Sequence, residues 1–575
     1  MVVKQEAVAA KAVFDVVVVG SGAGGLVAAV RAADLGLSAI VIEKEHRYGG
    51  TSATSGGFVW IPNHGRPGNE GDTREAALTY LSRVCQGDFR QDRVEACVDR
   101  GPEMVRYLDE IGIALDVIPF PDYFRDEPGA TDSRMIGARE LDAKELGEQF
   151  FTMRETFPAF RLFNRYTLDL MQAFAFAQRP RGWQWVAAKM FARYWLDLGW
   201  RRLTWRDRRL ALGAALIGRL RKAMLERDIP LWLDTKLTGL IERDGKIAGV
   251  CVARHGVAMT IEARHGVILA AGGFEQNQEM RDRYLPVRTD ARWSQSPKGA
   301  NMGEAIVAGE SIGAATESMD CCWWAPSMQL PSREVANSDA VHQMWLDHKH
   351  PHSLCVNRLG LRFVNEGGAY DRFGLAMIED QKRTGANIPC WMIFDATYRK
   401  LYTAGGILPS TVVPDRRIPR DWWDQYLYRA GSIEELAGKI DIDPATLAGT
   451  VARMNEFAHT GVDLDFGRGQ SSYDKFFGDP RHGPNPCLGP LDKAPFYAIR
   501  VDLGDLGGKG GLKADAAGRV LDRANDRPIE GLYAIGNSSG APWGNAYPGG
   551  GSTLGPATVF GFIAAGHIAR RANMG

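Results

Sequence analysis

The hydrophobic pattern of the chain begins with a run of β-branched residues. Val16 to Val19 are uninterrupted valines, a pattern typical of a strand buried on both faces of a parallel sheet. Residues 26–37 have the apolar spacing of a helix, and residues 39–42 form a second apolar run. Strand, helix and strand in this order predict a parallel α/β sheet near the N-terminus.

The glycines that follow the first predicted strand carry the first chemical signal. Gly20, Gly22 and Gly25 give the spacing G-x-G-x-x-G, in which the backbone turns tightly and a pyrophosphate approaches the N-terminus of a helix. Glu43 closes the second strand 18 residues after Gly25, where a carboxylate binds ribose hydroxyls. This part of the chain is therefore predicted to bind a dinucleotide.

A second loop of small residues points to the kind of dinucleotide. Residues 49–57 read GGTSATSGG directly after the second strand, so the backbone can lie close to a flat ligand and its phosphates. A flavin extends beyond the pyrophosphate and needs such a loop, whereas a nicotinamide dehydrogenase does not. The predicted cofactor is FAD, with a plain surface loop as the alternative. The glycine-rich loop 547–556 places further N–H groups beside the flavin.

The same hydrophobic periods continue along the rest of the chain. Asp244-Gly245 separates two strand-like runs, which predicts a hairpin with a tight turn. Residues 319–500 differ from their surroundings, because they are rich in Trp, Pro and polar residues. The predicted helices cover 73–112, 211–226 and 557–570, and the predicted strands cover 230–233, 237–241, 247–252, 266–273 and 531–536.

These elements predict an α/β protein with two structural units. We expect a Rossmann-like FAD-binding domain of the glutathione-reductase type, interrupted by a smaller α+β catalytic domain. The FAD-binding domain is expected at 1–318 and 501–575, and the catalytic domain at 319–500. An aromatic and basic insert at about 155–209 lies within the first part.

Composition and charge exclude several classes of function. The chain has 575 residues, of which 45% are hydrophobic and 24% charged, as in ordinary soluble proteins. The formal net charge is zero, so we expect no nucleic-acid partner. The eight cysteines show no metal-site spacing, and residues 1–13 lack the apolar core of a signal peptide. We expect reduced thiols and a cytoplasmic location.

A histidine-rich segment is the one candidate for a metal site. His348, His350 and His352 alternate in the manner of a metal-binding strand. Pro351 and the loop context instead favour a solvated turn, and we expect no metal.

Several stretches of the chain together form a recognisable set. They are GSGAGG at 20–25, Glu43, GGTSATSGG at 49–57, AAGGFE at 270–275, RFVNE at 362–366 and GLYAIGN at 531–537. This set resembles the flavoproteins related to fumarate reductase and the succinate dehydrogenase flavoprotein subunit. The resemblance extends over nearly the whole chain and implies FAD as the cofactor.

Three further pieces narrow the resemblance. They are PDYF around Tyr123, NEGGAYDRFG around Tyr370, and the Tyr547-x-x-x-Gly551 loop. These pieces are similar to the 3-ketosteroid Δ1-dehydrogenases within that superfamily. The resemblance implies that Tyr547 and the Gly551 N–H bind the ketone oxygen at C3 of a 3-ketosteroid. Tyr370 then takes the proton from C2 while Tyr123 assists it, and a hydride leaves C1 for flavin N5.

The resemblance also implies which residues bind FAD, and how. The covalent histidine of succinate dehydrogenases corresponds to Gly50 here, so we expect non-covalent FAD. The substrate-binding arginine of fumarate reductases corresponds to Tyr547, which suits a neutral ketone better than a carboxylate. The residues implied for FAD are Gly20, Gly22, Ala23, Gly24, Gly25, Glu43, Lys44, Gly50, Thr51, Ser52, Ser55, Gly56, Gly57, Ala271, Gly272, Gly536, Asn537, Ser552 and Leu554.

Three functions remain open at this point. The first is Δ1 desaturation of 3-ketosteroids. The second is another reaction on the same scaffold, such as Δ4 desaturation or reduction of an activated alkene. The third is a non-catalytic flavin electron carrier. The chain has a single dinucleotide fingerprint, so the expected electron acceptor is a quinone or another non-nicotinamide acceptor.

Residues 183–209 raise the question of a membrane surface. On helical spacing the positively and negatively charged residues Lys189, Arg193 and Asp197 share one face. The segment is either an amphipathic helix packed on the core, or a helix in a membrane interface with its arginines on anionic lipid. In the second case the protein is peripheral on the membrane. The opposite, apolar face carries Trp183, Ala187, Met190, Phe191, Tyr194, Trp195 and Leu198.

Overall fold

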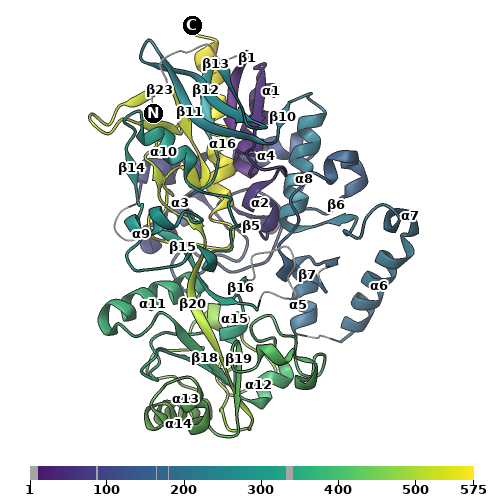
Figure 1. The fold of residues 1–575 in the computed structure, drawn as a ribbon, viewed down its shortest axis with the longest axis vertical. Helices are drawn as coiled ribbons and strands as arrows, with labels where there is room; N and C mark the ends of the chain where they lie inside the picture. Colours follow the sequence, from purple (N-terminus) through teal and green to yellow (C-terminus); the bar gives the residue numbers. More distant parts are fainter. Residues whose placement is uncertain (1–10, 86–88, 164, 179–180, 332–340, 575) are drawn as a thin grey trace.

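The computed structural model describes residues 11–85, 89–163, 165–178, 181–331 and 341–574. Two main sheets organise this part of the chain, one of eight strands and one of six. Figure 1 shows the eight-stranded sheet in the upper half of the molecule and the six-stranded sheet in the lower half. The fold is a mixed α/β fold, as predicted.

The eight-stranded sheet is built around the predicted valine strand. Its strands are β1 (Lys11–Val19), β2 (Ala39–Ile42), β10 (Leu231–Trp232), β11 (Thr235–Arg243), β12 (Lys246–Arg254), β13 (Val257–Leu269), β22 (Arg519–Leu521) and β23 (Pro528–Ala534). Strand β1 lies parallel to β2 on one side and to β13 on the other, and β23 lies parallel to β13. Val16, Val17 and Val18 are fully buried, which confirms a strand covered on both faces.

The predicted hairpin is present between β11 and β12. The two strands pair antiparallel, and the turn residues Asp244 and Gly245 both have positive φ, 54° and 74°. Two positive φ angles in a two-residue loop match the right-handed twist of the strands, and Asp-Gly adopts them readily.

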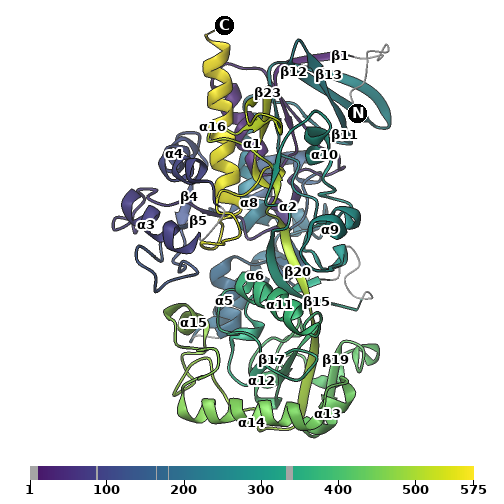
Figure 2. The same cartoon turned by 90° about the vertical axis from the view of Figure 1, so that its left-hand side faces the viewer.

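Helices cover the eight-stranded sheet and carry the loops of the cavity described below. Helix α1 (Ala23–Asp34) joins β1 to β2, and it packs against α16 (Leu554–Ala572) and α8 (Leu212–Leu225). The predicted helical segment 73–112 contains α3 (Arg74–Val84) and α4 (Gln91–Glu110). Figure 2 shows α16 running along this part of the molecule with α4 beside it, and α3 packs against α4.

The six-stranded sheet is antiparallel, with the order β16-β15-β20-β18-β17 and β19 paired to β20. These strands are β15 (Cys322–Gln329), β16 (Val341–Gln343), β17 (Ser353–Val356), β18 (Cys390–Phe394), β19 (Leu427–Ala430) and β20 (Phe496–Gly508). Strand β20 runs through the expected domain boundary between residues 500 and 501. The residues of β20 before and after that boundary therefore belong to the same six-stranded sheet.

Further elements complete the described part of the chain. The helices are α2 (Gly50–Thr54), α9 (Gln278–Tyr284), α10 (Glu304–Glu310), α11 (Tyr370–Thr384), α12 (Ala396–Leu401), α13 (Ile433–Lys439), α14 (Pro444–Thr460) and α15 (Ser472–Phe477). The short strands are β3 (Phe58–Trp60), β4 (Leu115–Val117), β5 (Met135–Ala138), β6 (Leu141–Asp142), β7 (Arg161–Leu162), β8 (Tyr166–Thr167), β9 (Arg209–Leu210), β14 (Thr316–Glu317) and β21 (Gly511–Leu512).

The aromatic insert forms α5 (Leu170–Gln178), α6 (Trp183–Leu196) and α7 (Leu198–Arg201). Figure 1 shows α6 and α7 at the edge of the molecule, away from both sheets. The single apolar face that we predicted is divided in the structure. Met190 and Tyr194 are buried, whereas Trp195 and Leu198 are exposed, because the Tyr194 hydroxyl donates to the Trp205 carbonyl at 2.7 Å and holds the chain folded back on the helix.

No helix in the described ranges is long and apolar enough to cross a membrane. All eight cysteines are free thiols, six of them buried.

Candidate active site

A cavity of about 1030 Å³ extends from the glycine turn after β1 to a group of buried tyrosines. Among the residues predicted to bind FAD, Ser552 does not line it: the Ser552 hydroxyl donates to the Gly549 carbonyl at 2.8 Å and closes a turn. The other predicted residues do line it, namely Gly20, Gly22, Ala23, Gly24, Gly25, Glu43, Lys44, Gly50, Thr51, Ser52, Ser55, Gly56, Gly57, Ala271, Gly272, Gly536, Asn537 and Leu554.

The glycine turn has the geometry that a pyrophosphate needs. A Cβ on Gly20, whose φ is +107°, would lie 2.3 Å from the Ala270 carbonyl oxygen, so only glycine fits. A Cβ on Gly22 would meet only the Ser52 hydroxyl, at 3.4 Å, so this backbone faces open space. Helix α1 begins there with no acidic residue in its first turn, and the Ser52 hydroxyl accepts its first N–H, that of Ala23, at 3.1 Å. Its N-terminal dipole and N–H groups are directed at the cavity, and FAD phosphates fit this place.

The acid at the end of β2 is held in place by the serine of the glycine turn. The Ser21 hydroxyl donates to one Glu43 oxygen at 2.6 Å, and the Glu45 N–H donates to the other at 3.1 Å. Glu43 is buried and lines the cavity. The Ser21 N–H also donates to the first of these oxygens, at 3.2 Å. The oxygen that accepts the Glu45 N–H is therefore the one that keeps a lone pair for a ribose hydroxyl. Lys44 pairs with Glu304 at 2.8 Å instead of being free for a phosphate.

Two loops that are far apart in the sequence meet at one backbone carbonyl. The Pro548 carbonyl accepts hydrogen bonds from the Tyr123 N–H at 3.0 Å and from the Tyr80 hydroxyl at 2.5 Å. The PDYF loop and the loop after Tyr547 are thus joined, and their tyrosine rings lie 5.1 Å apart. Gly551, with φ +98°, packs so closely on β3 that a Cβ would lie 2.8 Å from the backbone of Phe58.

Tyr370 completes the group from the other half of the molecule. It is the first residue of α11, where the helix dipole favours negative charge. The Tyr123 hydroxyl donates to the Tyr370 oxygen at 2.9 Å. The rings of Tyr370 and Tyr547 lie 5.6 Å apart, and the Tyr547 hydroxyl is 3.4 Å from the Thr553 hydroxyl. The three predicted tyrosines and Gly551 therefore meet at one cavity wall.

Burial determines the acidity of these phenols. Tyr123 and Tyr370 are fully enclosed, and burial raises the pKa of each well above its usual value. Burial also raises the pKa of Tyr547, against the hydrogen bond with Thr553, which lowers it. All three are neutral phenols at neutral pH unless other charges assist them. As neutral groups they are hydrogen-bond donors, and one of them must lose its proton to act as a base.

Comparison with known proteins places this arrangement in a family. A family model described as FAD binding domain matches residues 15–554. A 3-oxosteroid 1-dehydrogenase of Mycobacterium tuberculosis is 38% identical over 97% of this chain and 99% of its own length. A 3-ketosteroid Δ1-dehydrogenase from Sterolibacterium denitrificans, solved as a crystal structure in complex with 1,4-androstadiene-3,17-dione, is 42% identical, with a TM-score of 0.92 over 97% of this chain and 100% of that chain.

The chain belongs to the 3-oxosteroid 1-dehydrogenase family of FAD-binding flavoproteins. The predicted family resemblance, the FAD cofactor and the assignment as an oxidoreductase are confirmed. The relatives also include a 4-oxocyclohexanecarboxylate 2-dehydrogenase of Sinomonas cyclohexanicum, 33% identical over 98% of this chain and 94% of its own length.

The structure adds residues that the family motifs did not indicate. Tyr473, on α15, is buried with its ring 5.6 Å from that of Tyr123. Lys349 and Lys509 are buried within reach of aromatic rings of the same group. None of these three stands in a recognisable motif, because their positions depend on how distant loops pack. A lysine between two histidines and a lysine between glycines gave no sequence signal for this site.

Trp323 lies outside the cavity lining: it packs against Tyr547, with the rings 4.8 Å apart, and donates to the Asn537 side chain at 3.2 Å. One expectation from the sequence is corrected here. The segment of His348 and His352 is buried instead of solvated. The Arg468 guanidinium donates hydrogen bonds to the backbone carbonyls of His348, His350 and Ser353 and so holds the segment in the interior. No metal-binding cluster occurs in the residues that the structure describes.

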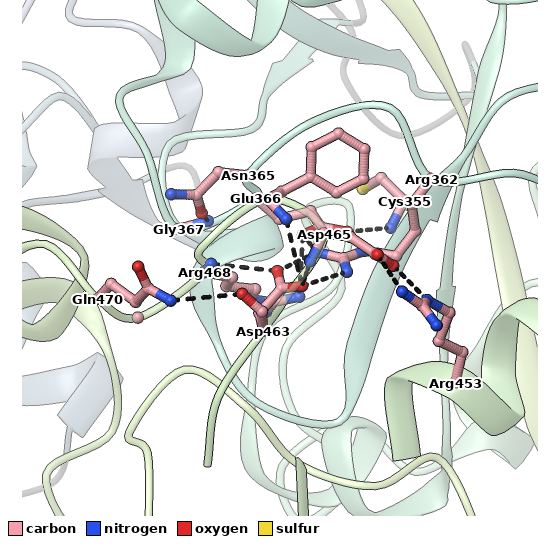
Figure 3. A network of polar contacts seen from close by, with 12 residues as sticks. Cys355, Arg362, Asn365, Glu366, Gly367, Arg453, Asp463, Asp465, Arg468 and Gln470 are labelled. Atoms are coloured by element: carbon pink, nitrogen blue, oxygen red, sulfur yellow. Dashed lines mark hydrogen bonds and ion pairs between the residues drawn. The ribbon is translucent and has the colours of Figure 1, made fainter. Parts of the chain in front are cut away.

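A buried ionic network fixes the segment that precedes Tyr370 (Figure 3). Arg362 pairs with Glu366 at 2.6 Å and with Asp463 at 2.8 Å, and Glu366 also accepts the Cys355 N–H of β17 at 3.1 Å. Arg468 lies 3.6 Å from Glu366. The network ties residues 362–366 to the six-stranded sheet and thereby sets where α11 begins.

Proposed function

We propose that this protein introduces a double bond between C1 and C2 of 3-ketosteroids. The observation that carries the proposal is the hydroxyl contact of 2.9 Å between Tyr123 and Tyr370, beside Tyr547 and Gly551 in the cavity that begins at the FAD turn. The steroid named with the Sterolibacterium denitrificans relative supports the same substrate class. A neutral phenol is also a better partner for a ketone than for a carboxylate.

The cofactor is proposed to lie with its pyrophosphate at Gly20–Gly25 and its ribose at Glu43, in a Rossmann-like domain of the glutathione-reductase type. The flavin then reaches Gly536, Asn537 and the N-terminus of α16, which has no side-chain cap. Binding is non-covalent, because Gly50 offers no side chain for a covalent bond. The division into 1–318 with 501–575 and 319–500 remains part of this proposal.

The chemical roles follow from what a desaturation beside a ketone needs. The Tyr547 hydroxyl and the Gly551 N–H donate hydrogen bonds to the ketone oxygen and stabilise the negative charge that develops there. Tyr370 takes the proton from C2, and the Tyr123 hydroxyl donates to the Tyr370 oxygen and stabilises its phenolate. FAD, when bound, would supply the hydride acceptor for C1 and a route for the electrons to a quinone or another non-nicotinamide acceptor.

The decisive experiment mixes the purified yellow protein with androst-4-ene-3,17-dione without oxygen. We expect the flavin absorbance to bleach, and the product to carry a new Δ1 double bond by mass and NMR. Adding a quinone or an artificial dye should restore the colour, whereas NAD should not. A flavin that the steroid cannot bleach would indicate an electron carrier, and a product with a different double bond would indicate another reaction on this scaffold.

We also propose that the insert contacts a membrane surface, as a lipid-soluble substrate and a membrane quinone would favour. Trp185 is 81% exposed, Leu196 78% and Leu198 67%, on the outer side of α6 and α7. Arg193 on the same helix has 56% of its side chain exposed. Exposed apolar residues beside cations are typical of helices that bind anionic membrane surfaces.

Sedimentation with anionic liposomes tests this contact. Wild type should pellet with the liposomes at low salt and less at high salt, because salt screens the charge attraction. Changing Trp185, Leu196 and Leu198 together to Ser should leave the protein in the supernatant. Changing Leu464, which is 76% exposed on the other half of the molecule, to Ser is the matched control and should have no effect. Wild type that stays in the supernatant at low salt rules the contact out.

A further inference from the structure

Two lysines of this protein are buried beside the tyrosine group without an ion-pair partner among the described residues. Lys349 and Lys509 are each 1% exposed. Burying an ammonium group costs several kcal/mol unless a carboxylate or a strong set of hydrogen bonds compensates for it. A buried cation at a cavity is therefore a candidate for a role in the chemistry.

Lys509 is attached to the loop of Tyr547. Its ammonium donates to the Asn545 carbonyl at 2.7 Å, two residues before Tyr547. The same nitrogen lies 4.7 Å from the ring centre of Trp323 and 5.7 Å from that of Tyr547. A cation at these distances from an aromatic face is attracted by the ring. Its charge also favours the deprotonated form of a nearby phenol such as Tyr547.

Lys349 binds the backbone that precedes Tyr370. Its ammonium donates to the carbonyl of Gly368, again two residues before the tyrosine, and to that of Gly367 at 3.2 Å. It lies 4.7 Å from the ring centre of Tyr473. The proposed base, Tyr370, and the proposed ketone ligand, Tyr547, are thus each preceded by a carbonyl that a buried lysine binds.

We propose that Lys349 and Lys509 are positioning residues that fix the loops of Tyr370 and Tyr547 and hold positive charge beside them while negative charge moves between the tyrosine and the substrate. The proposal rests on the proposed function. In that step the C2–H bond breaks, its proton goes to the Tyr370 oxygen, and the electron pair moves toward the ketone oxygen bound by Tyr547. The negative charge therefore starts near one lysine and ends near the other.

The charged groups around the two lysines are compatible with this role. Asp371 is buried in the first turn of α11, and one of its carboxylate oxygens has no hydrogen-bond partner in the described structure. Burial is the main cause that raises the pKa of Tyr123, Tyr473 and Tyr547, and the charge of Asp371 adds to it. A nearby cation acts in the opposite direction and favours a phenolate. The groups that face Lys509 are Asp371, Cys321, Cys322 and Cys85, and those that face Lys349 are Asp474, Cys487, Asp371 and Arg468.

The ammonium groups of both lysines lose their protons close to neutral pH. Burial lowers the pKa of Lys349 to about 7 and that of Lys509 to about 8, with nearby carboxylates acting in the opposite direction. The pKa of Tyr370 lies above both values. We therefore expect the rate of flavin reduction by androst-4-ene-3,17-dione to rise with pH up to about pH 7 to 8 and to level off above it, where the loss of lysine charge offsets the further ionisation of the tyrosine base.

The test replaces each lysine with Gln, which keeps an N–H donor for the backbone carbonyl but removes the charge. We expect the rate of flavin reduction to fall at least about tenfold, because one unit in the pKa of the base changes its ionised fraction tenfold. The steroid dissociation constant should stay close to that of wild type, and the rising part of the pH profile should move to higher pH. Lys493→Gln, at a side chain 67% exposed, is the control. Gln variants whose rates and pH profiles superimpose on those of wild type overturn the proposal.

A second measurement follows the unfolding of the FAD-bound protein as a function of pH. The folded pKa of each lysine lies below its unfolded value of 10.5, so the unfolded state binds more protons between the two values and stability rises with pH there. Wild type should gain stability from about pH 7 or 8 up to about pH 10, relative to Lys349→Met and Lys509→Met. Identical pH dependence in wild type and variants also overturns the proposal. This result does not depend on steroid turnover, so it stays separable from a failure of the proposed function.

Discussion

Tyr370→Phe is expected to leave FAD bound while turnover of a 3-ketosteroid falls by at least about 10²-fold, the low end for a general acid–base group. The change removes the oxygen that would accept the C2 proton and that receives the Tyr123 hydroxyl at 2.9 Å. The ketone should still bind, because its proposed contacts at Tyr547 and Gly551 remain. The measurements are the visible flavin spectrum, the steroid dissociation constant and the rate of flavin reduction.

Tyr547→Phe should give a loss of similar size for a different reason. It removes a hydrogen-bond donor to the developing negative charge, an effect of about 10²–10³-fold for one such donor. The steroid should bind more weakly in this variant than in Tyr370→Phe. Tyr428→Phe removes a hydroxyl from β19, outside the cavity lining, and should behave as wild type. Normal turnover in either active-site variant means that the role assigned to that tyrosine is wrong.

Much of the FAD-binding part could be predicted because its signals are local. The valine run, the glycine turn and the acid after β2 lie within 28 residues, and each position has one physical requirement. Gly20 must be glycine because a Cβ would meet the Ala270 carbonyl at 2.3 Å. Glu43 must end a strand beside that turn. Short-range patterns of this kind predict their own neighbours in space.

The arrangement of the tyrosine group could not be predicted from local sequence patterns alone. Tyr123, Tyr370 and Tyr547 are separated by hundreds of residues, and the family motifs indicated them without their geometry. Their contact depends on Pro548, whose carbonyl joins two loops, and on where α11 begins. The sequence did not indicate Tyr473 and the two lysines as site residues, because their importance comes from burial beside the tyrosines and not from a local sequence motif.

The aromatic insert shows how periodicity alone can mislead. Helical spacing placed Met190, Tyr194 and Trp195 on one face, but only Trp195 is exposed. The chain after α7 folds back, so that the Trp200 ring nitrogen donates to the Arg206 carbonyl at 3.0 Å and Trp200 is buried. One part of this helix face packs against the remainder of the insert and the other part faces solvent. Helical spacing alone does not tell which residues belong to each part.

The network around Glu366 explains why the segment before Tyr370 is rigid, and it predicts the largest loss of stability. Arg362, Glu366 and Arg468 have at most 4% of their side chains exposed. Removing one partner of a buried ion pair leaves an uncompensated charge in the interior, which costs about 3–5 kcal/mol. Glu366→Gln keeps the size of the side chain and removes the charge, so we expect the free energy of unfolding to fall by about that amount.

The pH dependence of the same variant provides an independent check. Burial acts to raise the pKa of Glu366, but the charge and hydrogen bonds of Arg362 outweigh it and hold the pKa below its usual value of 4.5. The stabilisation is therefore complete above pH 4.5 and is lost as the pH falls below it. Over this acidic range the free energy of unfolding, measured with urea, should fall more for wild type than for Glu366→Gln. Arg453→Met breaks the solvent-exposed pair with Asp465 in the same region (Figure 3) and should change stability little. Equal stability of wild type and Glu366→Gln would show that the network does not hold this segment in place.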